Sequence, residues 1–222
     1  MLDHPIARFE NLKVEFQTQD EPVEAVKGLS FDIAAGETVA IVGESGSGKS
    51  VSSLSLMRLV EYGGGEISDG RLLFVRGAAG QVDLRTMNPN DMRAIRGREI
   101  GMIFQEPMTS LNPVFTIGRQ LMEGLRLHMG LSKAAARSRA IDLLRQVRIP
   151  EPERRLGQYP HELSGGMRQR VVIAMALACE PRLLIADEPT TALDVTIQAE
   201  ILGLMNKLKK DTGTAVMFIT HD

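Results

Sequence analysis

Apolar residues recur along this chain with two different periods, and the two patterns alternate. Runs in which apolar residues alternate or follow one another predict β-strands at residues 7–16, 23–33 (one or two strands), 37–42, 71–75, 100–104, 182–186 and 214–220. Apolar residues spaced by three or four positions predict helices at residues 51–60, 89–96, 116–147 (two segments), 171–179 and 195–210. Strands that alternate with helices favour an α/β fold with a largely parallel sheet.

One long interval breaks this alternation. No strand pattern occurs between residues 115 and 182, where the apolar spacing is helical throughout. We interpret this interval as a helical subdomain inserted into an α/β core. The expected division is a core of residues 1–105 and 180–222, with a helical subdomain of residues 106–179.

A glycine-rich stretch, GESGSGKS, separates the strand predicted at residues 37–42 from the following helix. It fits the spacing G-x-x-x-x-G-K-[ST], and strand, loop and helix are the context in which that motif binds phosphate. The glycines let backbone N–H groups approach an anion, Lys49 adds a charge for the outer phosphates, and the Ser50 hydroxyl can ligate Mg²⁺. A plain glycine-rich turn is the alternative, and the flanking elements argue against it. We expect nucleotide contacts from Gly43, Glu44, Ser45, Gly46, Ser47, Gly48, Lys49, Ser50 and Val51.

Two carboxylates follow the apolar run LLIA near the end of the chain. They emerge at the carboxyl end of a predicted strand, which is where open α/β sheets bind ligands. Asp187 is suited to hold Mg²⁺ beside Ser50, and Glu188 to orient and polarise an attacking water. A strand end with two solvated acids is the alternative, and the phosphate loop in the same chain argues against it.

A second candidate anion site lies in the segment LSGGMRQ. Gly165 and Gly166 expose backbone N–H groups at the start of a predicted helix, with the Ser164 hydroxyl beside them. As a bare pattern, a helix-capping serine followed by a glycine turn explains this segment better. Only the accompanying motifs favour the anion site.

Composition narrows the class of protein. The chain has 26 basic and 28 acidic residues and a net charge of −2, which is unlike the basic footprint of a nucleic-acid binder. Its single cysteine, Cys179, excludes an internal disulfide framework and a cysteine-cluster metal site. The N-terminus lacks the pattern of a secretory signal, and no apolar run approaches the ~20 residues of a membrane span. We expect a soluble, cytosolic chain whose link to any membrane runs through a partner.

These motifs occur together in an order and spacing that resembles the ATP-binding cassette ATPases. The set comprises the phosphate loop, Gln105, LSGGMRQ, LLIADEP, residues 191–194 and His221, and the resemblance covers essentially the whole chain. It implies a P-loop NTPase (RecA-like) core with a mainly parallel sheet, an N-terminal antiparallel β region and an inserted helical subdomain. It also implies ATP and Mg²⁺ as cofactors.

The same resemblance implies roles for individual residues. The LSGG segment would be the signature motif, which contacts the γ-phosphate of ATP held by another cassette through Ser164, Gly165 and Gly166. Gln105 would link the γ-phosphate and the metal to the helical subdomain, and Asp194 would lie at the dimer interface.

Two further residues complete the expected site. His221 would be the switch histidine, delivered by a strand near Glu188 to contact the γ-phosphate, so that Glu188, His221 and Gln105 form the catalytic set. Phe16, on the first strand before a turn, is the best candidate to stack on adenine, with a core phenylalanine as the alternative.

A narrower resemblance concerns the dipeptide, oligopeptide and nickel importer ATPases, through residues 43–50, 103–113, 159–166 and 186–198. Residues 148–150 and 171–179 are most similar to the first half of two-cassette ATPases that import glutathione. This implies an ATPase at the cytoplasmic face of a membrane that powers import of peptides or glutathione. Its expected partners are a second cassette, transmembrane permease subunits and, indirectly, a substrate-binding protein. The end of the sequence at His221 and Asp222 would then fall inside a longer polypeptide.

Two other classes remain as alternatives. A cassette protein that acts on DNA or ribosomes is one, although no sustained heptad run separates the phosphate loop from the signature. A module that senses ATP without turnover is the other, and the presence of Glu188 and His221 argues against it.

Overall fold

The computed structural model describes residues 5–18, 21–77, 80–105, 110–190 and 195–221. Its strands are β1 (Ala7–Phe16), β2 (Val23–Ile33), β3 (Thr38–Val42), β4 (Gly65–Val75), β5 (Gln81–Asp83), β6 (Ile100–Ile103), β7 (Leu183–Asp187) and β8 (Ala215–Thr220). Its helices are α1 (Lys49–Leu56), α2 (Pro89–Ile95), α4 (Ile117–Met129), α5 (Lys133–Gln146), α6 (Pro152–Arg155), α7 (Gly165–Leu177) and α8 (Val195–Thr212), with 3-10 turns η1 (Val60–Gly63) and η3 (Pro160–Glu162).

A parallel sheet of four strands, in the order β3–β8–β7–β6, forms the centre of the molecule. All residues of β7 are buried, and Ile185 lies opposite Met102 of β6 and Met217 of β8. The two faces of β7 belong to different hydrophobic clusters, because successive side chains of a strand point in opposite directions. Ile185 packs into one cluster, and Leu184 and Ala186 pack into the other. The end of β7 is therefore held by a core on each side.

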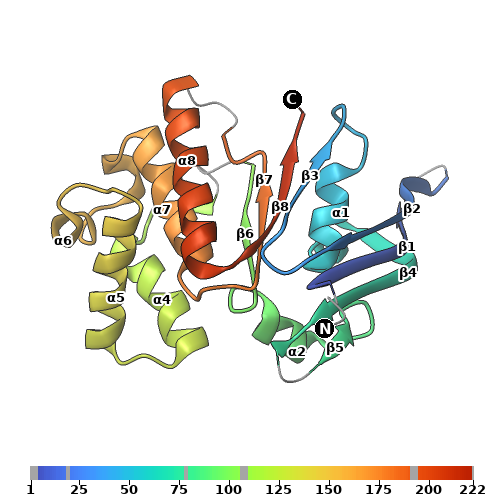
Figure 1. Ribbon diagram of the computed structural model, residues 1–222, viewed down its shortest axis with the longest axis horizontal. Coiled ribbons are helices and arrows are strands. Elements are labelled where there is room, and N and C mark those ends of the chain that lie inside the picture. Colours follow the sequence, from blue (N-terminus) through green and yellow to red (C-terminus); the bar gives the residue numbers. More distant parts are fainter. Residues whose placement is uncertain (1–4, 19–20, 78–79, 106–109, 191–194, 222) are drawn as a thin grey trace.

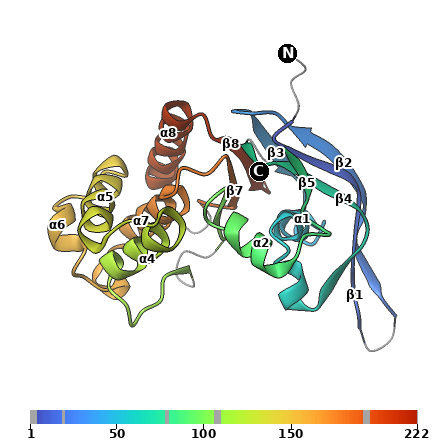
Figure 2. The same ribbon diagram turned by 90° about the horizontal axis from the view of Figure 1, so that it is seen from below.

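An antiparallel sheet, in the order β2–β1–β4–β5, forms a second layer. Helix α1 lies between this layer and the parallel sheet (Figures 1 and 2). Leu56 of α1 is fully buried in the same cluster as Phe9 and Leu12 of β1, and Phe9 stacks on Phe31 of β2 with ring centroids 4.3 Å apart. The antiparallel layer thus covers the helix that follows the phosphate loop. These two sheets bear out the predicted α/β fold with its antiparallel N-terminal region.

Helices α4 to α8 lie on the opposite side of the parallel sheet from α1 (Figure 1). The apolar spacing that predicted the first of them is confirmed, since Ile117, Leu121 and Leu125 of α4 are all buried. Thr116 and Ser132 cap α4 and α5 by accepting backbone N–H groups three residues on. Between residues 110 and 182 the structure contains no strand. Among the helices in the described ranges, none is long and apolar enough to cross a membrane.

The sequence-based boundaries were wrong in the segment after α1. Helix α1 ends at Leu56 rather than residue 60, because Arg58 adopts φ 49° and turns the chain into η1. Strand β4 begins at Gly65, six residues before the predicted start, and pairs there with Phe16 of β1. Its polar first half, GEISDG, carries little apolar signal. The short strand β5 was not predicted, and it pairs with the end of β4.

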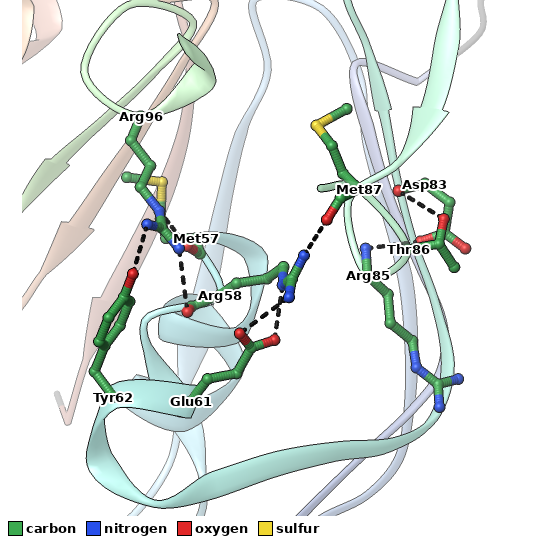
Figure 3. A network of polar contacts seen from close by, with 9 residues as sticks. All are labelled: Met57, Arg58, Glu61, Tyr62, Asp83, Arg85, Thr86, Met87 and Arg96. Atoms are coloured by element: carbon green, nitrogen blue, oxygen red, sulfur yellow. Dashed lines mark hydrogen bonds and ion pairs between the residues drawn. The ribbon is translucent and has the colours of Figure 1, made fainter. Parts of the chain in front are cut away.

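Two arginines tie the C-terminal end of α1 to the segment that precedes β6 (Figure 3). The Arg96 guanidinium donates to the carbonyls of Met57, at 2.8 Å, and Arg58, at 3.2 Å, and lies 5.5 Å from the ring centroid of Tyr62. The Arg58 guanidinium donates to the Met87 carbonyl. These contacts satisfy the carbonyls of Met57 and Arg58, just beyond the end of α1, and of Met87, before the start of α2. They also join the phosphate-loop helix to the strand that leads to Gln105.

Two glycine-to-alanine substitutions test the packing of the helical layer on the sheet. A Cβ atom at Gly101 would lie 2.3 Å from the Ala176 carbonyl oxygen, so Gly101→Ala has to push β6 and α7 apart. We expect a loss of about 1–3 kcal/mol in the free energy of unfolding, measured by denaturant titration. Gly124 of α4 has open space around it, and Gly124→Ala should stabilise the protein by about 0.5–1 kcal/mol. Equal unfolding midpoints for the two variants would contradict this packing.

Candidate functional site

The phosphate loop connects β3 to α1 and needs glycine for two physical reasons. Gly46 and Gly48 adopt φ 80° and 86°, in the left-handed region that side chains disfavour. A Cβ atom on Gly48 would also lie 2.4 Å from the Ala25 carbonyl oxygen of β2. Gly48 caps α1 without any side-chain hydrogen bond to the helix start. The first N–H groups of α1 therefore face the loop, which is the arrangement that binds phosphate.

Lys49 points its ammonium group into this loop. The side chain is 8% exposed, and Nζ donates to the carbonyls of Gly43, at 2.6 Å, and Glu44, at 2.7 Å. The loop thus wraps around a buried positive charge. The loop and residues 23–29 of β2 line a groove of about 790 Å³. A cation and helix N–H groups at the edge of a groove suit a polyphosphate.

Ser50 and Asp187 meet across 137 positions of sequence. The Ser50 hydroxyl donates to Asp187 Oδ1 at 3.1 Å, and Asp187 is 4% exposed. Burial raises the pKa of the Asp187 carboxyl; the Ser50 hydrogen bond lowers it, nearby Glu188 raises it and Lys49 lowers it. A hydroxyl and a carboxylate side by side are oxygen ligands of the kind that Mg²⁺ takes together with phosphate oxygens and water. Within the described ranges there is no cluster of three or more His, Cys, Asp or Glu residues that could hold a metal alone.

Glu188 follows β7 directly, and side chains that follow the two neighbouring strands lie against its carboxylate. Its Oε2 atom accepts from Gln105 Nε2 at 3.0 Å and lies 3.5 Å from His221 Nδ1. Gln105 comes after β6 and His221 after β8, so each neighbouring strand delivers one group to the same carboxylate. Glu188 itself adopts φ 44°, a strained conformation for a residue with a side chain, and its N–H donates to the Ile219 carbonyl at 3.0 Å.

The signature segment begins helix α7. Ser164 is the N-cap and accepts the Met167 N–H at 3.4 Å, which is the capping role that the bare pattern suggested. A side chain at Gly166 would press on Ile197 of α8, 3.3 Å away. No hydrogen bond or ion pair joins Ser164, Gly165 or Gly166 to the phosphate loop, all of whose residues the structure describes. The two candidate anion sites of this chain are therefore separate.

Two of the expected site residues are less well supported by the geometry. The Phe16 ring packs against Gly65, where a Cβ atom would lie 2.8 Å from its Cζ, and against the core beside β1. Phe16 does not line the groove beside the phosphate loop, so its stacking on adenine stays a prediction. Asp194 lies outside the described residues.

One buried residue near the site was not singled out from the sequence. Gln169 of α7 is 1% exposed, and its Nε2 atom donates to the carbonyl of Pro189, the residue after Glu188. Its position in the polar run MRQR gave no sign that this side chain, rather than its arginine neighbours, faces the core.

Comparison with known proteins identifies the family. The model of the ABC transporter family matches residues 26–191. The chain is 57% identical over 217 residues to the glutathione import ATP-binding protein of Pectobacterium atrosepticum, across 98% of this chain and 35% of that protein. It is 56% identical over 223 residues to a protein of Brucella abortus named as a candidate peptide import ATP-binding protein, across 100% of this chain and 66% of that protein. The chain thus spans between one third and two thirds of these relatives.

A solved structure agrees with the sequence comparisons. The dimeric ATP-binding cassette MJ0796, in a post-hydrolysis state bound to ADP and phosphate, superposes with a TM-score of 0.84 at 30% identity. The match covers 97% of this chain and 88% of that one. With its phosphate loop, its paired acids and its signature helix in this fold, the chain belongs to the ABC transporter family of ATP-binding cassettes.

Proposed function

We propose that this chain is the ATP-hydrolysing cassette of a membrane importer for peptides or glutathione. The observation that carries the proposal is the convergence of Gln105 and His221 on Glu188, beside the Ser50–Asp187 pair. The names of the relatives from Pectobacterium and Brucella support the substrate class. The cassette would work at the cytoplasmic face of the membrane.

Hydrolysis would proceed by charge neutralisation and positioning. The phosphate-loop N–H groups and Lys49 bind the β- and γ-phosphates. Glu188 accepts a proton from a water whose oxygen bonds to the γ-phosphorus as the bond to the ADP oxygen breaks. Gln105 donates to the Glu188 carboxylate, and His221 lies beside the same oxygen. A γ-phosphate offers both groups a more highly charged acceptor, which releases the carboxylate to act as a base.

Mg²⁺ fits the pair of oxygen atoms from Ser50 and Asp187, with Gln105 as a further candidate ligand. When bound, the ion supplies positive charge for the phosphate oxygens. The raised pKa of buried Asp187 reflects a carboxylate that lacks full compensation for burial, and a cation beside it supplies that compensation.

The second wall of the ATP site would come from another cassette. Ser164, Gly165 and Gly166 begin a helix that makes no polar contact with the phosphate loop of the same chain, and the matching MJ0796 structure is a dimer. Two chains, or two cassettes of one longer chain, would close face to face, with Asp194 near the interface.

The membrane partner would dock beside the strand that leads to Gln105. An apolar pocket of about 240 Å³ lies there between β6 and α7 and is lined by Met102, Phe104, Val172 and Met175, among others. Phe104 is 41% exposed and Val114 69% exposed. Residues 106–109, which we also expect in this surface, lie outside the described residues. A cytoplasmic helix of the permease with apolar side chains fits such a pocket.

The first prediction concerns the general base. Glu188→Gln keeps the size of the side chain and removes its basicity, so steady-state hydrolysis should fall at least about 100-fold while ATP binding persists. The variant should accumulate as a closed dimer with ATP, measured by size-exclusion chromatography. Glu123→Gln, on the exposed surface of α4, is the matched control. Normal turnover by Glu188→Gln would remove Glu188 from the base role, whereas a wild-type protein that binds ATP without hydrolysing it would favour the ATP-sensing alternative.

A second prediction separates the two walls of the site. Lys49→Ala removes a charged phosphate ligand and should weaken nucleotide binding by about 10- to 100-fold. Ser164→Arg should leave binding to the single chain intact and abolish dimer closure and turnover. Binding of a fluorescent ATP analogue and ATP-dependent dimerisation measure the two effects. Equal loss of binding in both variants would mean that the two motifs share one intramolecular pocket.

A third prediction concerns the metal. Asp187→Asn removes the charge opposite Mg²⁺, so calorimetric affinity for ATP should fall with Mg²⁺ present and stay unchanged in EDTA. Because the folded protein disfavours the Asp187 carboxylate at neutral pH, this variant should melt no lower than the wild type. Asp211→Asn, on the exposed end of α8, is the control. A loss of affinity that is the same in EDTA would contradict metal binding by Asp187.

A further inference from the structure

Gln169 is a polar side chain in a place where polarity is costly. It lies at 1% exposure on α7, among buried Val171, Val172 and Ile173. Its Nε2 atom donates to the Pro189 carbonyl, while Oε1 has no hydrogen-bond partner among the residues that the structure describes. The opposite orientation of the amide would set two oxygen acceptors against each other, so the donor has to face Pro189. An apolar side chain would avoid burying Oε1 without a partner, but it would also remove the donor to the Pro189 carbonyl, so the contact with Pro189 is what this polar side chain supplies.

The carbonyl that Gln169 holds adjoins the catalytic carboxylate. Pro189 follows Glu188, and its ring fixes its own φ and leaves it no N–H to donate. On the other side, the Glu188 N–H is held by the Ile219 carbonyl at 3.0 Å. The Glu188 backbone, strained at φ 44°, is therefore clamped on both sides. Strand β8 holds its N–H group, and α7 holds the carbonyl of the next residue. Strained conformations persist only where the surroundings hold them in this way.

The helix that makes this clamp also carries the signature. Ser164, its N-cap, precedes Gln169 by five positions, or about 7.5 Å along the helix axis. We propose that Gln169 is a positioning residue, which ties the signature helix to Pro189 and so sets the direction in which the Glu188 carboxylate points. This inference rests on the proposed ATPase function. It adds a route from the signature of a cassette to the base of that cassette's own site. The route runs through Gln169, which lies about one and a half helical turns from Ser164.

Gln169→Met tests the clamp in the full-length protein, because methionine fills nearly the same volume without a donor. We expect kcat for ATP hydrolysis to fall about tenfold, since a displaced base loses alignment with its water. The KM for ATP and the affinity of the single chain for nucleotide should stay within about twofold of the wild type. Gln169→Glu, which sets an oxygen against the carbonyl, should lower kcat at least as far.

Thr214→Val is the matched control, because Thr214 is also buried and donates from its side chain to a proline carbonyl, that of Pro181, at 2.8 Å. That bond lies at the opposite end of β7 and β8 from Glu188. We expect Thr214→Val and Gln169→Met to lower the melting temperature similarly and only Gln169→Met to lower kcat. If both variants lowered kcat equally, the Gln169 contact would stabilise the fold without positioning Glu188, and the proposal would be wrong.

A double-mutant cycle identifies the group through which Gln169 acts. In a Glu188→Gln background, Gln169→Met should leave the residual single-turnover rate and the ATP-trapped dimer unchanged, because no base remains to misplace. A further tenfold loss in that background would overturn the proposal. If the wild-type protein neither hydrolyses ATP nor dimerises with it, the proposed function itself fails. If the wild-type protein hydrolyses ATP and dimerises with it, and Gln169→Met has the same kcat, only the positioning role of Gln169 fails.

Discussion

The alignment of the parallel strands is the constraint on which the rest of the structure depends. Strand β7 is hydrogen-bonded in parallel register to β6 on one side and β8 on the other, so their carboxyl ends share one edge of the sheet. Gln105, Glu188 and His221 follow those ends, and for that reason groups far apart in sequence reach one carboxylate oxygen. A slip of one residue in β7 would exchange its two faces and turn Asp187 away from Ser50.

Several energetically unfavourable features lie at or beside this same edge of the sheet. Asp187 is buried with a raised pKa, Glu188 has a strained backbone, and Gln169 has an oxygen without a partner among the described residues. The strained backbone of Glu188 and the oxygen of Gln169 each cost on the order of 1–3 kcal/mol. They are tolerated because β7 lies between two hydrophobic clusters that fix its position from both faces. Local strain at a site of this kind is typical where catalytic groups must be held in place.

Sequence predicts the buried parts of this molecule well and the polar contacts poorly. The strands at residues 100–104, 182–186 and 214–220 were located to within one or two residues, because buried parallel strands are continuous apolar runs. The position of Asp187 beside Ser50 was predicted from its place at the carboxyl end of a strand, and the two side chains are hydrogen-bonded. The start of β4 was missed, because its first half is polar and its pairing with β1 is a long-range contact. Gln169 was missed because the pattern in MRQR does not reveal which polar side chain turns inward.

The geometry of the two anion sites explains why a single cassette would be an incomplete enzyme. Ser164 uses the Met167 N–H to cap its own helix, so chiefly the N–H groups of Gly165 and Gly166 remain for a ligand. Such a site is weak by itself, whereas the loop around Lys49 offers a full charge. In the proposed dimer, the loop of one cassette would bind ATP first and present its phosphates to the signature of the other cassette, which would not have to capture ATP alone. Closure then depends on nucleotide, and the Gln169 contact with Pro189 lies in the helix that closure would engage.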